Sequence, residues 1–167
     1  MKKVGIMSMQ RIANYGSFLQ AYALKQLIEE LGHKVEFVDY HVGAPVIAEN
    51  ADSKNKFVRK LEKGLETFRY QAPPSHKFSF IRYKQSFAKK YMPLLGITDE
   101  MNYNPTLDSL VIGSDEVFNC IQKNSNVGYS TELLGKDNHA DRVITYAASF
   151  GNTTLEKLEK YQKANEI

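Results

Sequence analysis

Three apolar stretches of this sequence each lead into a short loop of small and polar residues. The stretches cover residues 3–8, 107–112 and 142–146, and the loops after them cover residues 14–17, 113–115 and 147–151. Each stretch has the length and apolar character of a buried strand. Since ligands of an open parallel sheet bind beyond the carboxyl ends of the strands, the three loops predict one shared site at that edge.

Helical segments alternate with these strands. Residues 17–31 repeat apolar side chains at steps of three and four and end beside Gly32, which suits a helix C-terminus. We expect another strand over residues 34–40, a short edge segment over 129–134, and a last helix over 153–165 that Thr153 or Thr154 caps. The alternation predicts an α/β fold, a Rossmann-like, doubly wound and mainly parallel sheet, in one domain over residues 1–167.

A basic segment lies between the second and third predicted strands. Residues 54–90 hold eleven Lys or Arg and two acids, a local charge of +9 in a chain of net charge +3. Apolar side chains recur at helical spacing on both sides of Ala72-Pro73-Pro74, which predicts two amphipathic helices, basic outside and aromatic inside. This arm, residues 53–92, would be inserted into the domain.

The basic face would suit a nucleic acid, an anionic membrane surface or an acidic polymer. The sequence has no helix-turn-helix, zinc-ligand or RNP-like pattern, so we expect no nucleic-acid partner. We favour a solvated outer face that covers one side of the sheet, with peripheral membrane contact as the alternative.

Composition narrows the class of protein further. The hydrophobic share of 43% and the charged share of 25% are ordinary for a globular protein, and no apolar run is long enough to span a membrane. Met1-Lys2-Lys3 does not begin a signal peptide, and Cys120 is the only cysteine. We therefore expect a cytoplasmic protein with a packed, unreactive thiol. The four histidines lack metal-ligand spacing, so we expect neither a metal nor a cofactor.

The first loop, residues 14–17, lies where phosphate-binding loops usually fall, and the free N–H groups of the following helix favour an anion. It has neither the dinucleotide-binding nor the P-loop pattern, although Arg11 could supply a positive charge. The structural alternative is that Asn14 and Ser17 cap the helix, Tyr15 packs and Gly16 serves the turn. The sequence leaves both interpretations open.

Asp115 is the best candidate for a catalytic residue. It follows Gly113 and Ser114 at the end of a strand, where its carboxylate could bind a sugar hydroxyl or act as a general base. Glu116 is adjacent, and side chains of neighbours in a turn diverge, so we expect no facing acid–base pair. The alternative is a Ser or Asp cap for a helix that opens at Glu116. Asp39 is similar to a ribose-binding acid but lacks the accompanying glycine pattern.

Taken in order, these motifs resemble those of the polysaccharide pyruvyl transferase family. The resemblance rests on residues 14–24, 38–40, 113–119 and 146–151, and it extends from Met1 to Gly151. Two positions depart from the family pattern: Glu116 stands where the family usually has Gln, and Phe118 where it usually has Trp.

The resemblance implies the N-terminal domain of an enzyme similar in architecture to GT-B glycosyltransferases, with a C-terminal domain expected but absent from this chain. Family members transfer the enolpyruvyl unit of phosphoenolpyruvate to two sugar hydroxyls as a ketal. The implied donor is phosphoenolpyruvate, and the implied partner is a sugar or lipid-linked glycan acceptor in polysaccharide or cell-surface glycan biosynthesis. Asp115 would be the catalytic base, and the substrate-binding residues would be Asn14, Tyr15, Gly16, Ser17, Gly113, Ser114, Asn119, Ser149 and Gly151.

Two other interpretations stay open. The domain could bind the nucleotide sugar of a glycosyltransferase, or it could be a noncatalytic half that works only with a partner chain. An open cleft wall exposes apolar surface, which would also favour self-association.

Overall fold

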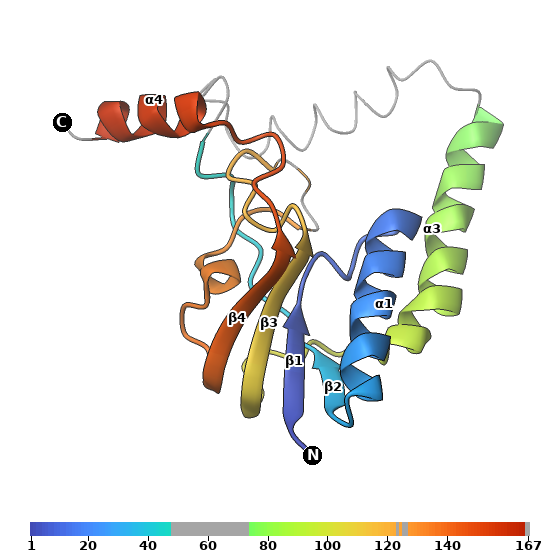
Figure 1. Ribbon diagram of the computed structural model, residues 1–167. Helices are drawn as coiled ribbons and strands as arrows, with labels where there is room; N and C mark the ends of the chain where they lie inside the picture. The colour runs from blue at the N-terminus through green and yellow to red at the C-terminus, as the bar shows by residue number, and fades with distance from the viewer. Residues whose placement is uncertain (48–73, 123, 125–126, 166–167) are drawn as a thin grey trace.

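The structure of this protein is a computed structural model that describes residues 1–47, 74–122, 124 and 127–165 (Figure 1). Its strands are β1 (Lys3–Met7), β2 (Lys34–Phe37), β3 (Leu107–Asp115) and β4 (Ala140–Ala148), and its helices are α1 (Tyr15–Glu30), α3 (Pro74–Leu95), α4 (Leu155–Asn165) and the 3₁₀ turn η1 (Thr131–Leu134). The four strands form one sheet in the order β2-β1-β3-β4, and every neighbouring pair is parallel. The predicted α/β class with a parallel, Rossmann-like sheet is confirmed.

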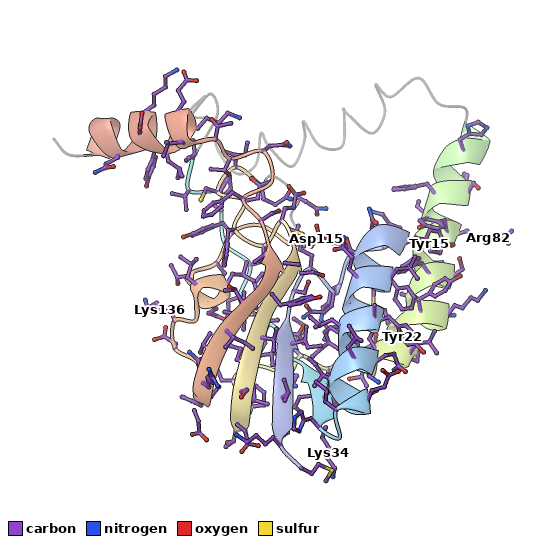
Figure 2. All side chains as sticks on the ribbon, viewed as in Figure 1. Tyr15, Tyr22, Lys34, Arg82, Asp115 and Lys136 are labelled. Carbon is purple, nitrogen blue, oxygen red and sulfur yellow. The ribbon has the colours of Figure 1, made fainter. Side chains whose placement is uncertain are left out.

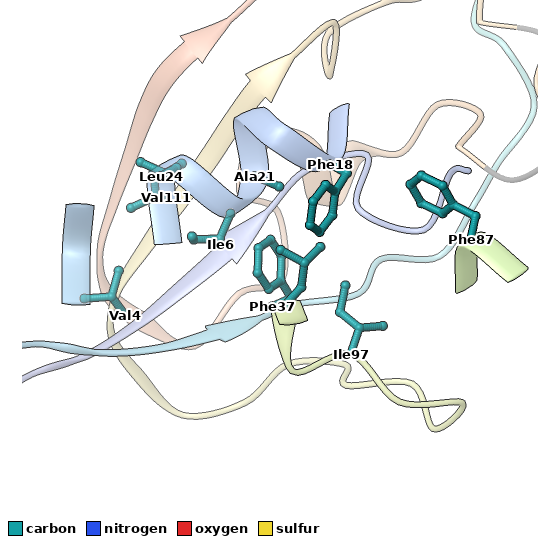
Figure 3. Packing of buried hydrophobic residues seen from close by; sticks show 10 residues of the cluster. Val4, Ile6, Phe18, Ala21, Leu24, Phe37, Phe87, Ile97 and Val111 are labelled. Atoms are coloured by element: carbon teal, nitrogen blue, oxygen red, sulfur yellow. The ribbon is translucent and has the colours of Figure 1, made fainter. Parts of the chain in front are cut away.

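The helices α1 and α3 cover one face of this sheet. Phe18, Ala21 and Leu24 follow one another at intervals of three residues, so their side chains lie on the face of α1 that packs against the strands, as the sequence predicted. Figure 3 shows these side chains against β1 and β3, with Phe87 entering from α3. Burying each large apolar side chain contributes about 1.5–3 kcal/mol, so this layer is a major source of stability.

The opposite face of the sheet is covered by loops and η1. Residues that alternate with the first set along β1 and β3 lie in this second cluster, which contains Met7, Leu110 and Ile112. Val127 and Leu133 pack against them from the segment after β3. Both faces of β1 and β3 are therefore buried, which explains why their sequences are nearly continuous apolar runs.

The prediction of an edge segment over residues 129–134 is wrong for most of its length. Only Tyr129 forms an isolated antiparallel bridge, to Gly43, and the chain then turns into η1. Ser130 accepts a hydrogen bond from the backbone N–H of Glu132, and Gly135 ends the turn in the left-handed conformation at φ +83°. A side-chain cap and a glycine stop thus favour a helical turn over a strand.

The last helix is capped by Thr154 alone. The Thr154 Oγ1 accepts a hydrogen bond from the backbone N–H of Lys157 at 3.3 Å, and α4 begins at Leu155. The hydroxyl of Thr153 is buried and bonds elsewhere, to Asn119 and to the backbone of Cys120. Helix α4 extends away from the sheet, and β4 is the outer strand on that side (Figure 1).

The basic arm is described only in its second half. Helix α3 begins at Pro74, the second proline of the pair that was predicted to separate the two helices, whereas the first predicted helix lies outside the described residues. In the second half of α3, Phe87 is buried and Tyr83 and Tyr91 pack beside it. In the first half, Phe78 is 74% exposed and Phe80 is 56% exposed, so the expectation that the aromatic residues lie inside holds only where α3 contacts α1.

Among the described residues, no helix combines the length and the apolar character that a transmembrane span requires.

Candidate functional site

The start of α1 and the end of β3 meet at the carboxyl edge of the sheet. The hydroxyl of Ser17 donates a hydrogen bond to Oδ2 of Asp115 at 2.5 Å, although the two residues are far apart in the sequence. The other carboxylate oxygen of Asp115 accepts a hydrogen bond from the backbone N–H of Glu116 at 2.9 Å. Two of the predicted loops are thereby joined at the residue that the sequence singled out as a base.

Asn14 is the N-cap of α1. Its side-chain Oδ1 accepts hydrogen bonds from the backbone N–H groups of Gly16, at 2.8 Å, and Ser17, at 3.2 Å. The structural interpretation of Asn14 is confirmed. Because the cap occupies two of the free N–H groups of the first turn, the helix start is less suited to bind an anion. The capping role considered for Ser17 is not observed, since its hydroxyl donates a hydrogen bond to Asp115 instead.

Asp115 adopts an uncommon backbone conformation. Its φ is +83°, in the left-handed region that residues with a side chain usually avoid. Such a conformation costs about 1–3 kcal/mol and is found preferentially at functional sites. The carboxylate is partly exposed and lies beside the start of α1 (Figure 2). This geometry supports Asp115 as the centre of the candidate site.

Gly113 and Ser114 shape the strand end below Asp115. Both are buried, and a Cβ atom on Gly113, whose φ is +116°, would overlap the carbonyl oxygen of Tyr146. The Ser114 carbonyl accepts a hydrogen bond from the hydroxyl of Ser8 at 2.9 Å, and its own hydroxyl donates to Gln20 at 3.3 Å. The two predicted binding residues therefore lie beneath the edge of the site.

The loop after β4 joins the same edge. The backbone N–H of Ser149 donates to the carbonyl of Asp115 at 3.0 Å, and the Ser149 carbonyl accepts from Phe118 at 3.1 Å. The Ser149 residue is exposed, so its hydroxyl is accessible beside Asp115. All three loops expected to share a site are thus brought together.

The buried side chain of Asn119 links the loop after β3 to the loop after β4. Its Nδ2 donates to Oε2 of Glu116 at 2.8 Å, and its Oδ1 accepts from the hydroxyl of Thr153 at 3.0 Å and from the backbone N–H of Ile121 at 3.2 Å. Asn119 is only 4% exposed, so in this structure its amide supports the loops instead of lining their surface.

Gly151 lies against the Glu116 side chain. A Cβ atom at Gly151 would overlap Oε2 of Glu116 and lie 2.9 Å from its Cβ, and the φ of Gly151 is +52°. The position therefore favours glycine for two reasons, contact and conformation. The side chain of Glu116 points toward Asn119 whereas that of Asp115 points toward Ser17, so the expected divergence of the two carboxylates is confirmed.

Tyr15 lies on the far side of the α1 N-terminus from Asp115. Its ring contacts those of Tyr83, Phe87 and Tyr91 on α3, with centroid separations of 5.9, 5.2 and 5.4 Å, and Figure 2 shows it between the two helices. A hydrogen bond with Tyr91, with smaller effects of burial and neighbouring charge, raises the pKa of Tyr15 above its ordinary value. This is the packing role named as the structural alternative.

Arg11 and Asp39 do not take part in this site. The guanidinium of Arg11 binds both carboxylate oxygens of Asp39 at 2.6 Å, and the hydrogen bond to Asp39 raises the pKa of Arg11. Asp39 is buried and also accepts hydrogen bonds from Gln10 and from the backbone of Asn102. The pair neutralises itself, so the structure supports neither a phosphate-binding Arg11 nor a ribose-binding Asp39.

Sequence reasoning missed the contributions of Ser8 and Gln20. Gln20 lies three residues after Ser17, on the same side of α1, and this spacing is the one signal that could have indicated it. Ser8 had no such signal, because its partner Ser114 is remote in sequence.

The described residues hold no group of three or more His, Cys, Asp or Glu that could bind a metal ion. Burial raises the pKa of the Cys120 thiol, which reduces its reactivity and agrees with a structural role.

Comparison with known families identifies the chain. Residues 14–165 match the family model described as polysaccharide pyruvyl transferase. The chain belongs to the polysaccharide pyruvyl transferase family. A search of curated proteins and a search of solved structures gave no match. The range that matches the pyruvyl transferase family begins at Asn14 and ends in α4, so it includes all three loops of the candidate site.

Proposed function

We propose that this chain forms the acceptor-binding wall of a pyruvyl transferase, which moves pyruvate from phosphoenolpyruvate to two sugar hydroxyls during polysaccharide or cell-surface glycan synthesis. The observation that carries the proposal is the Ser17–Asp115 contact at the carboxyl edge of the sheet, within the matched family range. The GT-B-like architecture and the donor are implied by family resemblance.

The reaction requires two proton acceptors and one proton donor. The two sugar oxygens form bonds to the carbon that carries the phosphate, and the bond from that carbon to the phosphate oxygen breaks. The two hydroxyl groups lose two protons. One proton is matched by a proton added to the methylene carbon, which becomes a methyl group, and the other leaves with the released phosphate. A carboxylate positioned against a sugar hydroxyl would assist each attack.

Asp115 has the geometry for this role. Its Oδ2 already accepts a hydrogen bond from a hydroxyl group, that of Ser17, and the residue is partly exposed. A sugar hydroxyl that replaced or joined Ser17 would meet the same acceptor, while the Ser149 hydroxyl lies on the neighbouring loop. We propose Asp115 as the base, Ser17 as the group that orients its carboxylate, and Ser149 as an acceptor ligand.

The donor requires positive charge for its carboxylate and phosphate. Arg11, the cation near the first loop, is paired with Asp39, so it is poorly suited to this task. We therefore assign the donor-binding cations to the C-terminal domain that the family resemblance implies.

Ligand-dependent unfolding and transfer assays test the proposal. Acceptor oligosaccharides at a hundredfold excess over Kd should raise the free energy of unfolding by about 2.7 kcal/mol. The melting temperature of the chain should rise accordingly. Asp115→Asn should remove this response, whereas Asp141→Asn, an exposed acid on β4, should keep it. In a transfer assay with phosphoenolpyruvate as donor, Asp115→Asn should also abolish formation of the ketal methyl group, which proton NMR detects.

Three outcomes would contradict the proposal. Stabilisation by nucleotide sugars alone would favour the glycosyltransferase interpretation, and unchanged turnover of Asp115→Asn in the transfer assay would remove Asp115 from the mechanism. A chain that binds none of these ligands would favour the noncatalytic interpretation.

A further inference from the structure

The first two turns of α3 expose three large apolar side chains: Phe78 and Ile81 lie on one side of the helix, and Phe80 lies on another, beside Tyr83 and Lys84. Phe78 is 74% exposed, Phe80 is 56% exposed and Ile81 is 54% exposed. These turns extend past the start of α1, so the sheet and α1 do not cover them (Figure 1). Single exposed apolar residues are common, but three that point to different sides of the same two turns indicate a helix end that contacts something apolar. We call Phe78, Phe80 and Ile81 the α3 tip.

Basic residues directly follow the α3 tip along the helix. Helix α3 contains five Lys or Arg residues and no acid. Arg82 and Lys84 are exposed directly after the tip, and the Lys84 ammonium lies 4.7 Å from the centroid of the Phe80 ring. The Arg82 side chain points away from α1 into solvent (Figure 2). The tip therefore combines aromatic and aliphatic surface with cations that can reach beyond it.

We propose that the α3 tip binds the surface of an anionic membrane. Phe78, Phe80 and Ile81 would enter the boundary between headgroups and acyl chains, where exposed aromatic and aliphatic side chains gain burial. Arg82 and Lys84 would contact lipid phosphates, since long cationic side chains can extend to the headgroups from an apolar stem. The contact is peripheral, in agreement with the absence of any spanning helix among the described residues.

Charge favours a bilayer over a second copy of this chain. Two α3 helices that face each other would bring like charges together, because the helix has five basic residues and no acid. A nucleic acid or another polyanion would satisfy the charge but would not require Ile81 or Phe78 to be exposed beside it. An anionic membrane is complementary to both the charge and the apolar surface.

Membrane docking would also orient the candidate site. The N-terminal end of α3 lies toward the same edge of the domain as the carboxyl end of β3, which carries Asp115 (Figures 1 and 2). A domain bound through the tip would hold this edge near the lipid surface, where a lipid-linked glycan would be presented. The membrane proposal stands on the tip alone and does not depend on pyruvyl transfer.

Vesicle flotation tests the proposal without any substrate. The chain should float with vesicles that contain phosphatidylglycerol and should bind vesicles of phosphatidylcholine alone far more weakly. Replacing Arg82 and Lys84 together with Gln should lower the partition coefficient about thirtyfold, because each charge near the surface is worth about 1 kcal/mol. Phe78→Ser with Ile81→Ser should lower it at least about tenfold.

The control carries changes of the same kind elsewhere. Leu27 on α1 is 52% exposed, and the Lys136 side chain is 63% exposed, so Leu27→Ser with Lys136→Gln should bind vesicles like the parent chain. Equal binding to neutral and anionic vesicles would overturn the proposal. It would also fail if the apolar variant floats like the control while only the charge variant dissociates, which would indicate a general polyanion site. Self-association lost in the apolar variant, with no vesicle binding by the parent, would indicate a second copy instead.

Discussion

Two regions of this domain are stabilised in different ways. In the helical layer, α1 and α3 are joined by aromatic rings: Phe18, Phe87 and Tyr91 have centroid separations of 4.8 to 6.2 Å. In the exit loops, residues 115–122 and 148–153, the contacts are hydrogen bonds between particular polar groups, such as those of Asn119 with Glu116 and Thr153. The layer depends on burial, and the loops depend on matched donors and acceptors.

This difference determines what each region tolerates. Apolar packing has no preferred direction and accepts side chains of similar volume at modest cost. A buried polar network loses stability whenever one partner is removed, since the remaining group is left without a hydrogen bond. The exit loops carry the candidate site, so their specificity of contact also positions Asp115 and Ser149.

The largest expected effect is in the helical layer. Phe87 is 1% exposed, and Phe87→Ala should lower the free energy of unfolding by about 3–5 kcal/mol through lost burial and a residual cavity. The same truncation at the α3 tip, Phe78→Ala, should change it by no more than about 0.5 kcal/mol. Urea denaturation of both variants measures the contrast. Similar losses of stability in the two variants would contradict the structure, because they would show that Phe78 is buried as deeply as Phe87.

Gly151→Ala tests steric contact in the exit loops. The new methyl group would approach the Cβ of Glu116 to 2.9 Å, and overpacking of this kind costs about 1–3 kcal/mol. The positive φ adds a further cost, which Gly32→Ala isolates, because Gly32 has φ +82° and no atom within 4 Å of the place that a methyl group would take. Gly151→Ala should therefore lower the free energy of unfolding, measured by denaturant titration, more than Gly32→Ala does. Equal losses of stability in the two variants would show that the cost at Gly151 comes from backbone conformation and not from contact with Glu116.

Asn119→Ala tests the hydrogen bonds of the exit loops. It would leave the buried hydroxyl of Thr153 and the N–H of Ile121 without their acceptor, at a cost of about 1–3 kcal/mol. Asn152→Ala, at an exposed position nearby, is the control and should change stability little. Faster hydrogen exchange at the Ser149 N–H in Asn119→Ala alone would show that Asn119 holds this loop on Asp115. Unchanged exchange would limit its role to local packing.

The smallest expected effect concerns alkaline pH and the helical layer. The hydrogen bond with Tyr91 raises the pKa of Tyr15, so the folded chain keeps a proton that the unfolded chain loses at about pH 10. Stability from this source is complete below pH 10 and declines as the pH rises through the folded pKa. Tyr15→Phe should therefore show a shallower loss of stability between about pH 9 and 11 than the parent chain. Parallel curves would show that the Tyr15 proton does not contribute.

Much of the helical layer could be predicted because burial leaves a periodic trace. The spacing of Phe18, Ala21 and Leu24 indicated α1 and its buried face, and the proline pair indicated where α3 begins. The same pattern overstated burial at Phe80, since α3 continues past the start of α1. Periodicity identifies a helical face but not the length over which another element covers it.

The candidate site left a weaker trace in the sequence. The sequence indicated that loops 14–17, 113–115 and 147–151 would meet, because parallel strands end at the same edge. It also pointed to Asp115, but not to the Ser17 hydroxyl as its partner, nor to the links of Asn119 with Thr153 and of Ser8 with Ser114.

The chain's order of residues was sufficient to define the α/β class, the strand-to-loop design and the family motifs, because these depend on local spacing and composition. The tertiary structure alone decided that Ser17 faces Asp115, that Arg11 and Asp39 pair with each other, and that Phe78 and Phe80 stay exposed. Each of these depends on which remote group lies within a few ångströms. Hydrogen bonds, ion pairs and burial act over such short distances that only the folded chain selects their partners.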